Sequence, residues 1–299
     1  MLGRRLFSTE TASKLIGVVG GGQMGTGIAF VGALRAQSKV LVVDGNATQL
    51  DKSSSFMDSL LSKQVQKGLL TEVQAKEVKS RVRFSSKIED LSSADFCIEA
   101  VSENTELKQN VFRALDKVAG PDTILATNTS SISITKIAAV TSRPEKVIGM
   151  HFFYPVPVLE LVEIVKGLAT AQTTVDKTVQ LARAMGKTTT NALDVPGFIS
   201  NRILMPYINE AFLTLQENIG TPEDIDTTMK LGTNVPMGPL TLADFIGLDT
   251  CLNIMRVLHE NLGSDKYAPA PLLIKYVDAG WLGRKTGRGV FSYAAAIKK

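Results

Sequence analysis

His151 and Glu163 are the two residues of this chain whose types and spacing most clearly suggest chemistry. His151 is one of only two histidines, and it opens a run that ends at Glu163. The nearly apolar segment around His151, the corners at Pro155 and Pro157, and the segment 159–165 predict a strand, a tight turn and a returning strand. That fold would bring the carboxylate beside the imidazole. Such a pair near a dinucleotide can take a hydroxyl proton while hydride leaves the same carbon.

A glycine-rich turn predicts where the dinucleotide binds. The pattern Gly20-x-Gly22-x-x-Gly25 follows the apolar segment 15–19, and Asp44 ends the next apolar segment. The first glycine permits a tight turn, the second lets the backbone approach a pyrophosphate, and the third lets helix and strand pack closely. The N–H groups at the start of the helix then meet the phosphates. A carboxylate at position 44 would accept from ribose hydroxyls and repel a 2′-phosphate, so we expect NAD rather than NADP.

The elements that would position these groups follow from the alternation of the sequence. From residue 14 to about 194, short apolar segments alternate with amphipathic ones, which predicts an α/β fold with a parallel sheet and crossover helices. The predicted strands are 15–19, 40–43, 82–85, 96–99, 124–127 and 147–152. The polar segment 46–80, broken near Lys67, is predicted to form two helices that project from the sheet and cover a ligand. We therefore predict a Rossmann-type dinucleotide-binding domain over 14–194.

After Asp194 the strand pattern stops, and an all-α domain is predicted over 195–299. Proline and N-cap residues favour helix starts at Pro196, Thr221, Pro239 and Pro271. The first of these helices is expected to run to about residue 217. Apolar residues line both of its sides, so we expect a homodimer that forms through this substrate-binding domain.

Composition limits the class of protein. With 44% hydrophobic and 21% charged residues among 299, the chain is typical of a soluble globular enzyme. The net charge of +4 comes without a long Lys/Arg run, so no nucleic acid is expected. No apolar stretch reaches the roughly 20 residues that span a bilayer. Cys97 and Cys251 are expected to be buried reduced thiols, and no metal-ligand spacing is found.

Residues 1–13 are predicted to be a targeting or disordered segment. The stretch from Met1 to Thr11 contains two arginines, hydroxyl residues and apolar residues but only one acid. This composition resembles a short mitochondrial presequence, so the mitochondrial matrix is the expected location. An unprocessed N-terminus on a cytoplasmic protein is the alternative.

With these features in place, the chain resembles the short-chain L-3-hydroxyacyl-CoA dehydrogenase family, and within it the 3-hydroxybutyryl-CoA group. The resemblance rests on the stretches 20–27, 98–104, 126–131, 151–163, 196–202 and 283–289. It implies NAD-dependent oxidation of an L-3-hydroxyacyl-CoA to the 3-oxoacyl-CoA, or the reverse reduction. It also implies a short acyl chain and a place in fatty-acid β-oxidation or butyrate metabolism.

The resemblance assigns roles to individual residues. His151 would be the general base and Glu163 the carboxylate that orients it, while Ser130 would hydrogen-bond the reacting oxygen. Asn201 would hold the same oxygen or the thioester from the second domain. The implied cofactor contacts are Gly20, Gly22, Gln23, Met24, Gly25, Asp44, Glu103, Lys108, Asn128 and Lys285, and the implied coenzyme A contacts are Ser59 and Lys67.

One position departs from the family pattern. Tyr154 stands where the family commonly has Asn, between Phe153 and Pro155. A phenol must point elsewhere or occupy space in the cleft, so we expect an altered preference for substrate size or a lower turnover.

Several alternatives stay open on the sequence alone. Glu163 could be the polar face of a strand, Ser130 a helix cap, and Lys67, Lys108 and Lys285 ordinary solvated lysines. A β-hydroxyacid dehydrogenase is one rival class, but it needs a lysine on the interdomain helix, and none occurs between Asn201 and Gly220. A sugar-acid dehydrogenase on the same scaffold and a non-catalytic, crystallin-like NAD-binding protein are the others.

Overall fold

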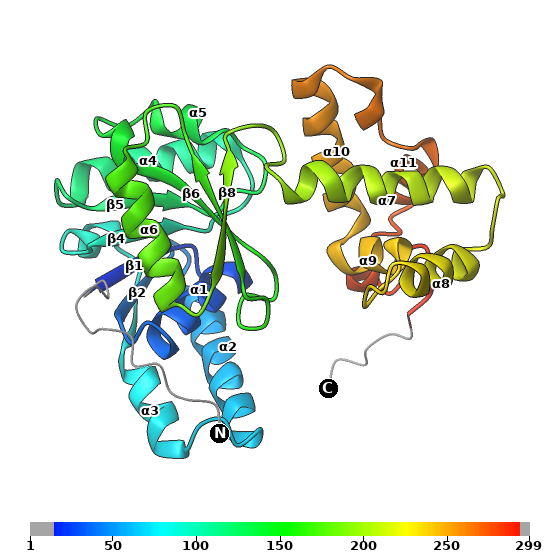
Figure 1. Ribbon diagram of the computed structural model, residues 1–299. Helices are drawn as coiled ribbons and strands as arrows, with labels where there is room; N and C mark the ends of the chain where they lie inside the picture. Colours follow the sequence, from blue (N-terminus) through cyan, green and yellow to red (C-terminus); the bar gives the residue numbers. More distant parts are fainter. Residues whose placement is uncertain (1–14, 294–299) are drawn as a thin grey trace. The chain divides into compact units, whose positions relative to one another are not determined.

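The computed structural model describes residues 15–293, and the chain divides after Asp194 into two compact units (Figure 1). The predicted presequence therefore lies outside the described residues. No helix among the described residues is long and apolar enough to cross a bilayer.

The first unit is built around one eight-stranded sheet with the order β3-β2-β1-β4-β5-β6-β7-β8. The strands are β1 (Leu15–Val19), β2 (Lys39–Val43), β3 (Val82–Ser85), β4 (Phe96–Glu99), β5 (Ile124–Thr127), β6 (Val147–Phe152), β7 (Leu161–Lys166) and β8 (Thr188–Leu193). All neighbours are parallel except β6 and β7, which are antiparallel. The Rossmann-type prediction is confirmed, as are the predicted strands. The edge strand β8 was not predicted.

The order reverses between β1 and β4, and ligands of such sheets bind at the carboxyl ends of the strands near this reversal. Because β1, β2, β4, β5 and β6 run in the same direction, the residues that follow these strands gather at one edge. This edge carries the glycine turn, Asp44, Asn128 and the end of the strand that contains His151.

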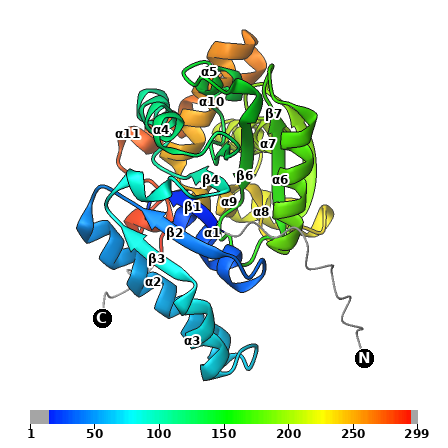
Figure 2. The same ribbon diagram turned by 90° about the vertical axis from the view of Figure 1, so that its left-hand side faces the viewer.

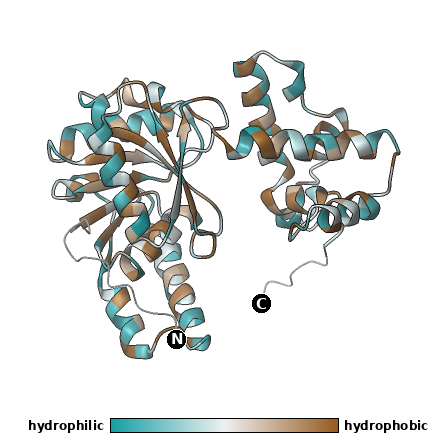
Figure 3. Cartoon of the chain, in the orientation of Figure 1, coloured by the Kyte–Doolittle hydropathy of each residue, from teal (hydrophilic) through white to brown (hydrophobic). Residues whose placement is uncertain are grey.

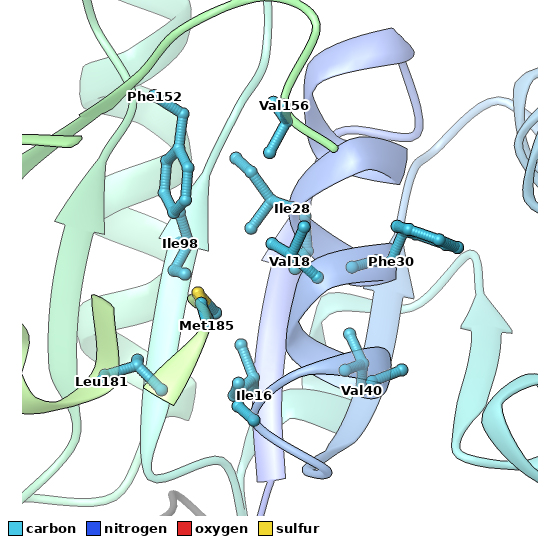
Figure 4. Close-up of a cluster of buried hydrophobic side chains, with 14 of the residues drawn as sticks. Ile16, Val18, Ile28, Phe30, Val40, Ile98, Phe152, Val156, Leu181 and Met185 are labelled. Carbon is cyan, nitrogen blue, oxygen red and sulfur yellow. The ribbon is translucent and has the colours of Figure 1, made fainter. Parts of the chain in front are cut away.

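The helices of the first unit are α1 (Gln23–Leu34), α2 (Ala47–Gln66), α3 (Glu72–Ser80), α4 (Thr105–Val118), α5 (Ile134–Ala138) and α6 (Gln172–Ala184), with 3₁₀ turns at Ile88–Leu91 and Pro144–Lys146. In Figure 2, α4 and α5 lie on one side of the strands and α6 on the other. Side chains from β1, α1, β6 and α6 meet in a common core (Figure 4), in which Ile28 and Ile98 are fully buried.

The predicted helical hairpin is also present, and it extends from the sheet as α2 and α3 (Figure 1). Asn46 caps α2 by accepting from the amide of Gln49, and Thr71 and Gln74 form a capping box at α3. These caps give hydrogen-bond partners to backbone N–H groups at the starts of both helices, which would otherwise be bonded only to water.

The second unit contains α7 (Ser200–Gln216), α8 (Pro222–Gly232), α9 (Pro239–Ile246), α10 (Leu248–Leu262) and α11 (Pro271–Asp278), with 3₁₀ turns at Asp265–Tyr267 and Arg284–Thr286. The prediction of a helical second half is confirmed, but the start of α7 was placed too early. Gly197 and Phe198 have φ angles of 78° and 49°, which are incompatible with a right-handed helix. Brown apolar residues alternate with teal polar ones along these helices (Figure 3), as expected for helices that bury one face.

Both cysteines are buried, as predicted. Burial raises the pKa of the Cys97 and Cys251 thiols to about 12. Among residues 15–293 no cluster of ionisable side chains is arranged to hold a metal ion.

Candidate active site

The glycine turn has the geometry that a pyrophosphate site needs. Gly20 has a φ of 109°, which favours glycine, and its amide donates to the carbonyl of Val43 across 2.8 Å. A Cβ on Gly25 would lie 1.9 Å from the carbonyl oxygen of Gly20, so only glycine lets α1 begin so close to the turn. A Cβ on Gly22 would meet nothing within 4 Å, so the backbone there is open to a ligand. Gln23 and Met24 form the first turn of α1.

Asp44 lies at the end of β2 and is oriented by the same turn. Its Oδ2 accepts from the amide of Gly21 across 2.8 Å, and its Oδ1 accepts from the amide of Asn46 across 2.9 Å. Gln49 donates from Nε2 to the carbonyl of Gly21 across 2.7 Å. A carboxylate in this place fits the ribose hydroxyls of NAD and repels an added phosphate, so the residues present suit NAD.

His151 and Glu163 form a buried pair. They are direct partners in the antiparallel register of β6 and β7, so their side chains project from the same face of the sheet. Nδ1 of His151 lies 2.8 Å from Oε2 of Glu163, and the side chains are 9% and 2% exposed. Because an ionised carboxylate can only accept, Nδ1 carries the proton and Nε2 is left as the basic nitrogen. The Phe153 ring packs 4.6 Å from the imidazole, centroid to centroid.

Glu103 organises the turn that carries Ser130. Its Oε1 lies 2.6 Å from the hydroxyl of Thr129, 2.8 Å from the amide of Ser130, and 3.1 Å from the amide of Ser131. The hydroxyls of Ser130 and Ser131 also donate to it. Burial raises the pKa of Glu103, but the charge of Lys108 and the hydrogen bonds from Thr129 and Ser130 outweigh burial and hold the pKa below its ordinary value. Position 103 therefore shapes the Ser130 turn, a role that the sequence did not indicate.

Glu99 is a buried acid to which the sequence analysis assigned no role. Its Oε1 accepts from Nζ of Lys108 and from the amide of Val101, both across 2.7 Å, and its Oε2 accepts from the hydroxyl of Thr127 across 2.7 Å. Both charged side chains are essentially unexposed, so the interpretation of Lys108 as a solvated lysine is wrong. Nζ of Lys108 also lies 3.4 Å from Oε2 of Glu103. An acid that ends an apolar strand, followed by a lysine nine positions later, was the available signal.

Asn128 joins two strand ends of the site. Its Oδ1 accepts from the amide of Phe152 across 2.8 Å, which ties the residue after β5 to the residue after His151. The cofactor contact expected at this position stays a prediction.

The remaining predicted site residues lie elsewhere in the chain. Ser59 and Lys67 are exposed on the α2–α3 hairpin, where Lys67 is the C-cap of α2. Asn201 and Lys285 belong to the second unit. Asn201 is buried near the start of α7, and Nζ of Lys285 pairs with Asp249 at 2.5 and 2.7 Å. The ligand contacts expected of these four residues stay predictions.

A Rossmann-type sheet with this glycine turn, together with a buried imidazole–carboxylate pair at the same edge, is the architecture of nicotinamide-dependent dehydrogenases. The chain matches the profile of the 3-hydroxyacyl-CoA dehydrogenase NAD-binding domain over residues 15–195. It matches the profile of the C-terminal domain of 3-hydroxyacyl-CoA dehydrogenase over residues 197–293. The chain therefore belongs to the 3-hydroxyacyl-CoA dehydrogenase family.

Individual relatives are similar over nearly their whole length. The probable 3-hydroxybutyryl-CoA dehydrogenase of Bacillus subtilis is 51% identical over 280 residues, which cover 94% of this chain and 97% of that protein. The mitochondrial hydroxyacyl-coenzyme A dehydrogenase of Homo sapiens is 39% identical, with 97% of each chain covered. The crystal structure of (S)-3-hydroxybutyryl-CoA dehydrogenase from Ralstonia eutropha has a TM-score of 0.91 at 46% identity, and covers 94% of this chain and 99% of that one.

Proposed function

We propose that this protein interconverts L-3-hydroxyacyl-CoA and 3-oxoacyl-CoA with NAD, with His151 as general base. The observation that carries the proposal is the buried contact of 2.8 Å between His151 and Glu163 at the sheet edge that carries the glycine turn. The family and the names of the relatives support a CoA thioester over a free hydroxy acid or sugar acid as substrate.

The chemistry divides between the cofactor and the chain. NAD held at the glycine turn and Asp44 would supply the acceptor for the hydride of the substrate carbon. Nε2 of His151 accepts the hydroxyl proton, and the carboxylate of Glu163 stabilises the imidazolium that results. The turn held by Glu103 carries Ser130, whose single hydroxyl proton would turn from Glu103 to donate to the reacting oxygen.

The substrate is expected to be short. Relatives named 3-hydroxybutyryl-CoA dehydrogenase are about half identical to this chain over most of its length, which supports a four-carbon acyl group. Ser59 and Lys67 remain our candidates for coenzyme A contacts, since an ammonium on the exposed hairpin suits a phosphate. Rates with C4 to C16 3-oxoacyl-CoA substrates, each with NADH and NADPH, test the acyl length and the preference for NAD. The preferred length then favours either butyrate or fatty-acid metabolism.

The proposed reaction is tested by following NADH absorbance at 340 nm with acetoacetyl-CoA. We expect turnover in the wild type and a loss of about a hundredfold or more in His151→Ala. His259→Ala is the matched control, because His259 is the other histidine and its side chain is 41% exposed in the second unit. NADH binding without turnover in the wild type would instead support a non-catalytic NAD-binding protein.

We also propose that the protein forms a homodimer through the second unit. Ile203 on α7, Ile219 after it and Leu231 on α8 are between 66% and 73% exposed, and a second copy of the chain could cover these apolar side chains. Light scattering should give twice the monomer mass, and Ile203→Glu should lower it. A wild-type monomer at micromolar concentration would contradict the proposal.

A mitochondrial location is proposed from the composition of residues 1–11, with support from the mitochondrial human relative. Import of the full chain into isolated mitochondria, with shortening at the N-terminus, is the expected result. A chain that stays outside and keeps its length would favour the cytoplasm.

A further inference from the structure

Lys187 is a buried lysine that the proposed chemistry does not use. It lies directly before β8, and the whole residue is only 6% exposed. Its Nζ donates to the carbonyl of Val156 across 2.5 Å and to the carbonyl of Leu159 across 2.8 Å. Both acceptors belong to the segment 153–160, here called the hairpin turn, which connects β6 with β7.

Burying an ammonium without a carboxylate partner costs free energy of desolvation. Desolvation lowers the pKa of Lys187; Glu160 opposes this shift and Arg35 adds to it. Within the described residues no carboxylate lies within ion-pair distance of Nζ. The ammonium therefore donates to backbone carbonyls of a single turn. A methionine would fill similar space without the cost of desolvating a charge.

The hairpin turn is also pressed against the helix that begins at the glycine turn. Val156 is 1% exposed and lies beside Ile28 of α1 (Figure 4). A Cβ on Gly27 would lie only 2.8 Å from Cβ of Val156, so α1 has a glycine where the turn makes contact. Lys187 thus contacts the turn through two backbone carbonyls, and α1 contacts it through the side chain of Val156.

We propose that Lys187 is a positioning residue for hydride transfer: it fixes the hairpin turn, and with it Phe153 and Tyr154, against α1. This inference rests on the proposed function. We call the two bonds from Lys187 to the hairpin turn the clamp. The clamp does not set the position of His151, because His151 and Glu163 are paired by the register of β6 and β7. Loosening the turn should therefore disturb the groups beside the base without changing its protonation.

Because Lys187 is expected to affect the position of the hairpin turn but not the protonation of His151, Lys187→Met should lower the rate without changing its pH dependence. We expect kcat to fall about tenfold or more, because displacement of site groups by about 1 Å can cost that much or more. The apparent pKa in the pH profile and the affinity for NADH should stay close to those of the wild type. Lys187→Arg should recover much of the rate, because a guanidinium can also donate to two carbonyls.

The matched control is Lys146→Met. Nζ of Lys146 also donates to a backbone carbonyl, that of Pro121 across 2.5 Å, and pairs with Asp122 at 2.9 Å. It precedes β6, at the other end of that strand from His151. Its loss should leave kcat within about twofold of the wild type, with all rates measured on folded protein well below the melting temperature.

A kcat for Lys187→Met within about twofold of the wild type would overturn the inference, as would equal losses in Lys187→Met and Lys146→Met. If Lys187→Met does not fold, Gly27→Ala is the second variant: its added methyl group would displace Val156 and should lower kcat in the same way. An unchanged rate in Gly27→Ala overturns the inference too.

Hydrogen exchange measures the stability of the hairpin turn without any substrate. The amides to follow are those of Val158 and Leu159, which donate to the carbonyl of Pro155 across 2.9 and 3.0 Å. Faster exchange in Lys187→Met, with exchange in Lys187→Arg close to that of the wild type, supports the role of Lys187 in holding the turn, and unchanged exchange in Lys187→Met overturns it. Failure of the proposed function is seen separately, as a wild type without turnover.

Discussion

Nδ1 of His151 lies 2.8 Å from Oε2 of Glu163 because the two residues face each other across one antiparallel strand pair. The contact is therefore set by backbone hydrogen bonds of the sheet rather than by flexible loops. Replacing either side chain should leave the sheet intact, which makes the pair suitable for substitution.

Glu163→Gln should lower kcat by about a hundredfold or more while NADH still binds. The amide can donate to Nδ1, which would place the ring proton on Nε2 and remove the base. The measurement is NADH oxidation with acetoacetyl-CoA, together with NADH titration. Glu160→Gln is the control, because Glu160 is the exposed acid of the same hairpin turn. Equal effects in both variants would argue against a special role for Glu163.

Glu103→Gln should loosen the Ser130 turn and make stability depend less on pH. Since the pKa of Glu103 is lowered in the folded protein, its carboxylate contributes stability above the ordinary value of 4.5, and this contribution is lost as the pH falls through the folded pKa. The wild type should therefore be the more stable protein at pH 7, and the difference should shrink below about pH 4.5. Urea unfolding from pH 7 to pH 3 measures this, and a difference that does not change with pH would contradict it. A fall in kcat of about tenfold is expected at pH 7.

Asp44→Ser should shift cofactor preference toward NADPH. Removing the carboxylate removes both an acceptor for the ribose hydroxyls and a charge that repels a 2′-phosphate. We expect the ratio of kcat/KM for NADH to that for NADPH to fall by roughly tenfold or more. Asp51→Ser, on the exposed surface of α2, is the control. An unchanged ratio would mean that selectivity lies elsewhere.

Tyr154→Asn should change the preference for acyl length or raise turnover. Tyr154 is 45% exposed and lies three positions after His151 in the hairpin turn. An amide side chain is smaller than the phenol, so it would leave more space at this position of the hairpin turn. kcat/KM values for C4 and longer 3-oxoacyl-CoA substrates check this prediction, and it fails if both are unchanged.

The parts of the fold that sequence could predict are those with a strong local signal. β1, β4 and β5 are apolar segments buried on both faces, and their boundaries follow from composition. β8 is an edge strand of mostly polar residues with only Ala192 buried, so no apolar run marks it. α10 follows α9 with only Gly247 between them, and that glycine ends one helix and caps the next. Neighbours in space rather than local sequence define β8, whereas the start of α10 is set by the backbone of Gly247, whose φ is 104°.

The site shows the same limit. His151 and Glu163 were predictable because a hairpin turns a separation of twelve residues into a contact. The Glu103 contacts with the Ser130 turn span 27 residues, and Lys187 reaches Val156 across 31, so both depend on how the sheet is assembled. Family resemblance marked Glu103 and Lys108 as significant, but the structure adds that Glu99 balances the charge of Lys108 within the fold.

The reversal of chain direction between β6 and β7 also has an evolutionary consequence. The proton acceptor and the acid that steadies it are encoded in one short continuous stretch, so recombination can copy them between genes as a single block. Substitutions elsewhere in the chain can then accumulate without separating these two residues.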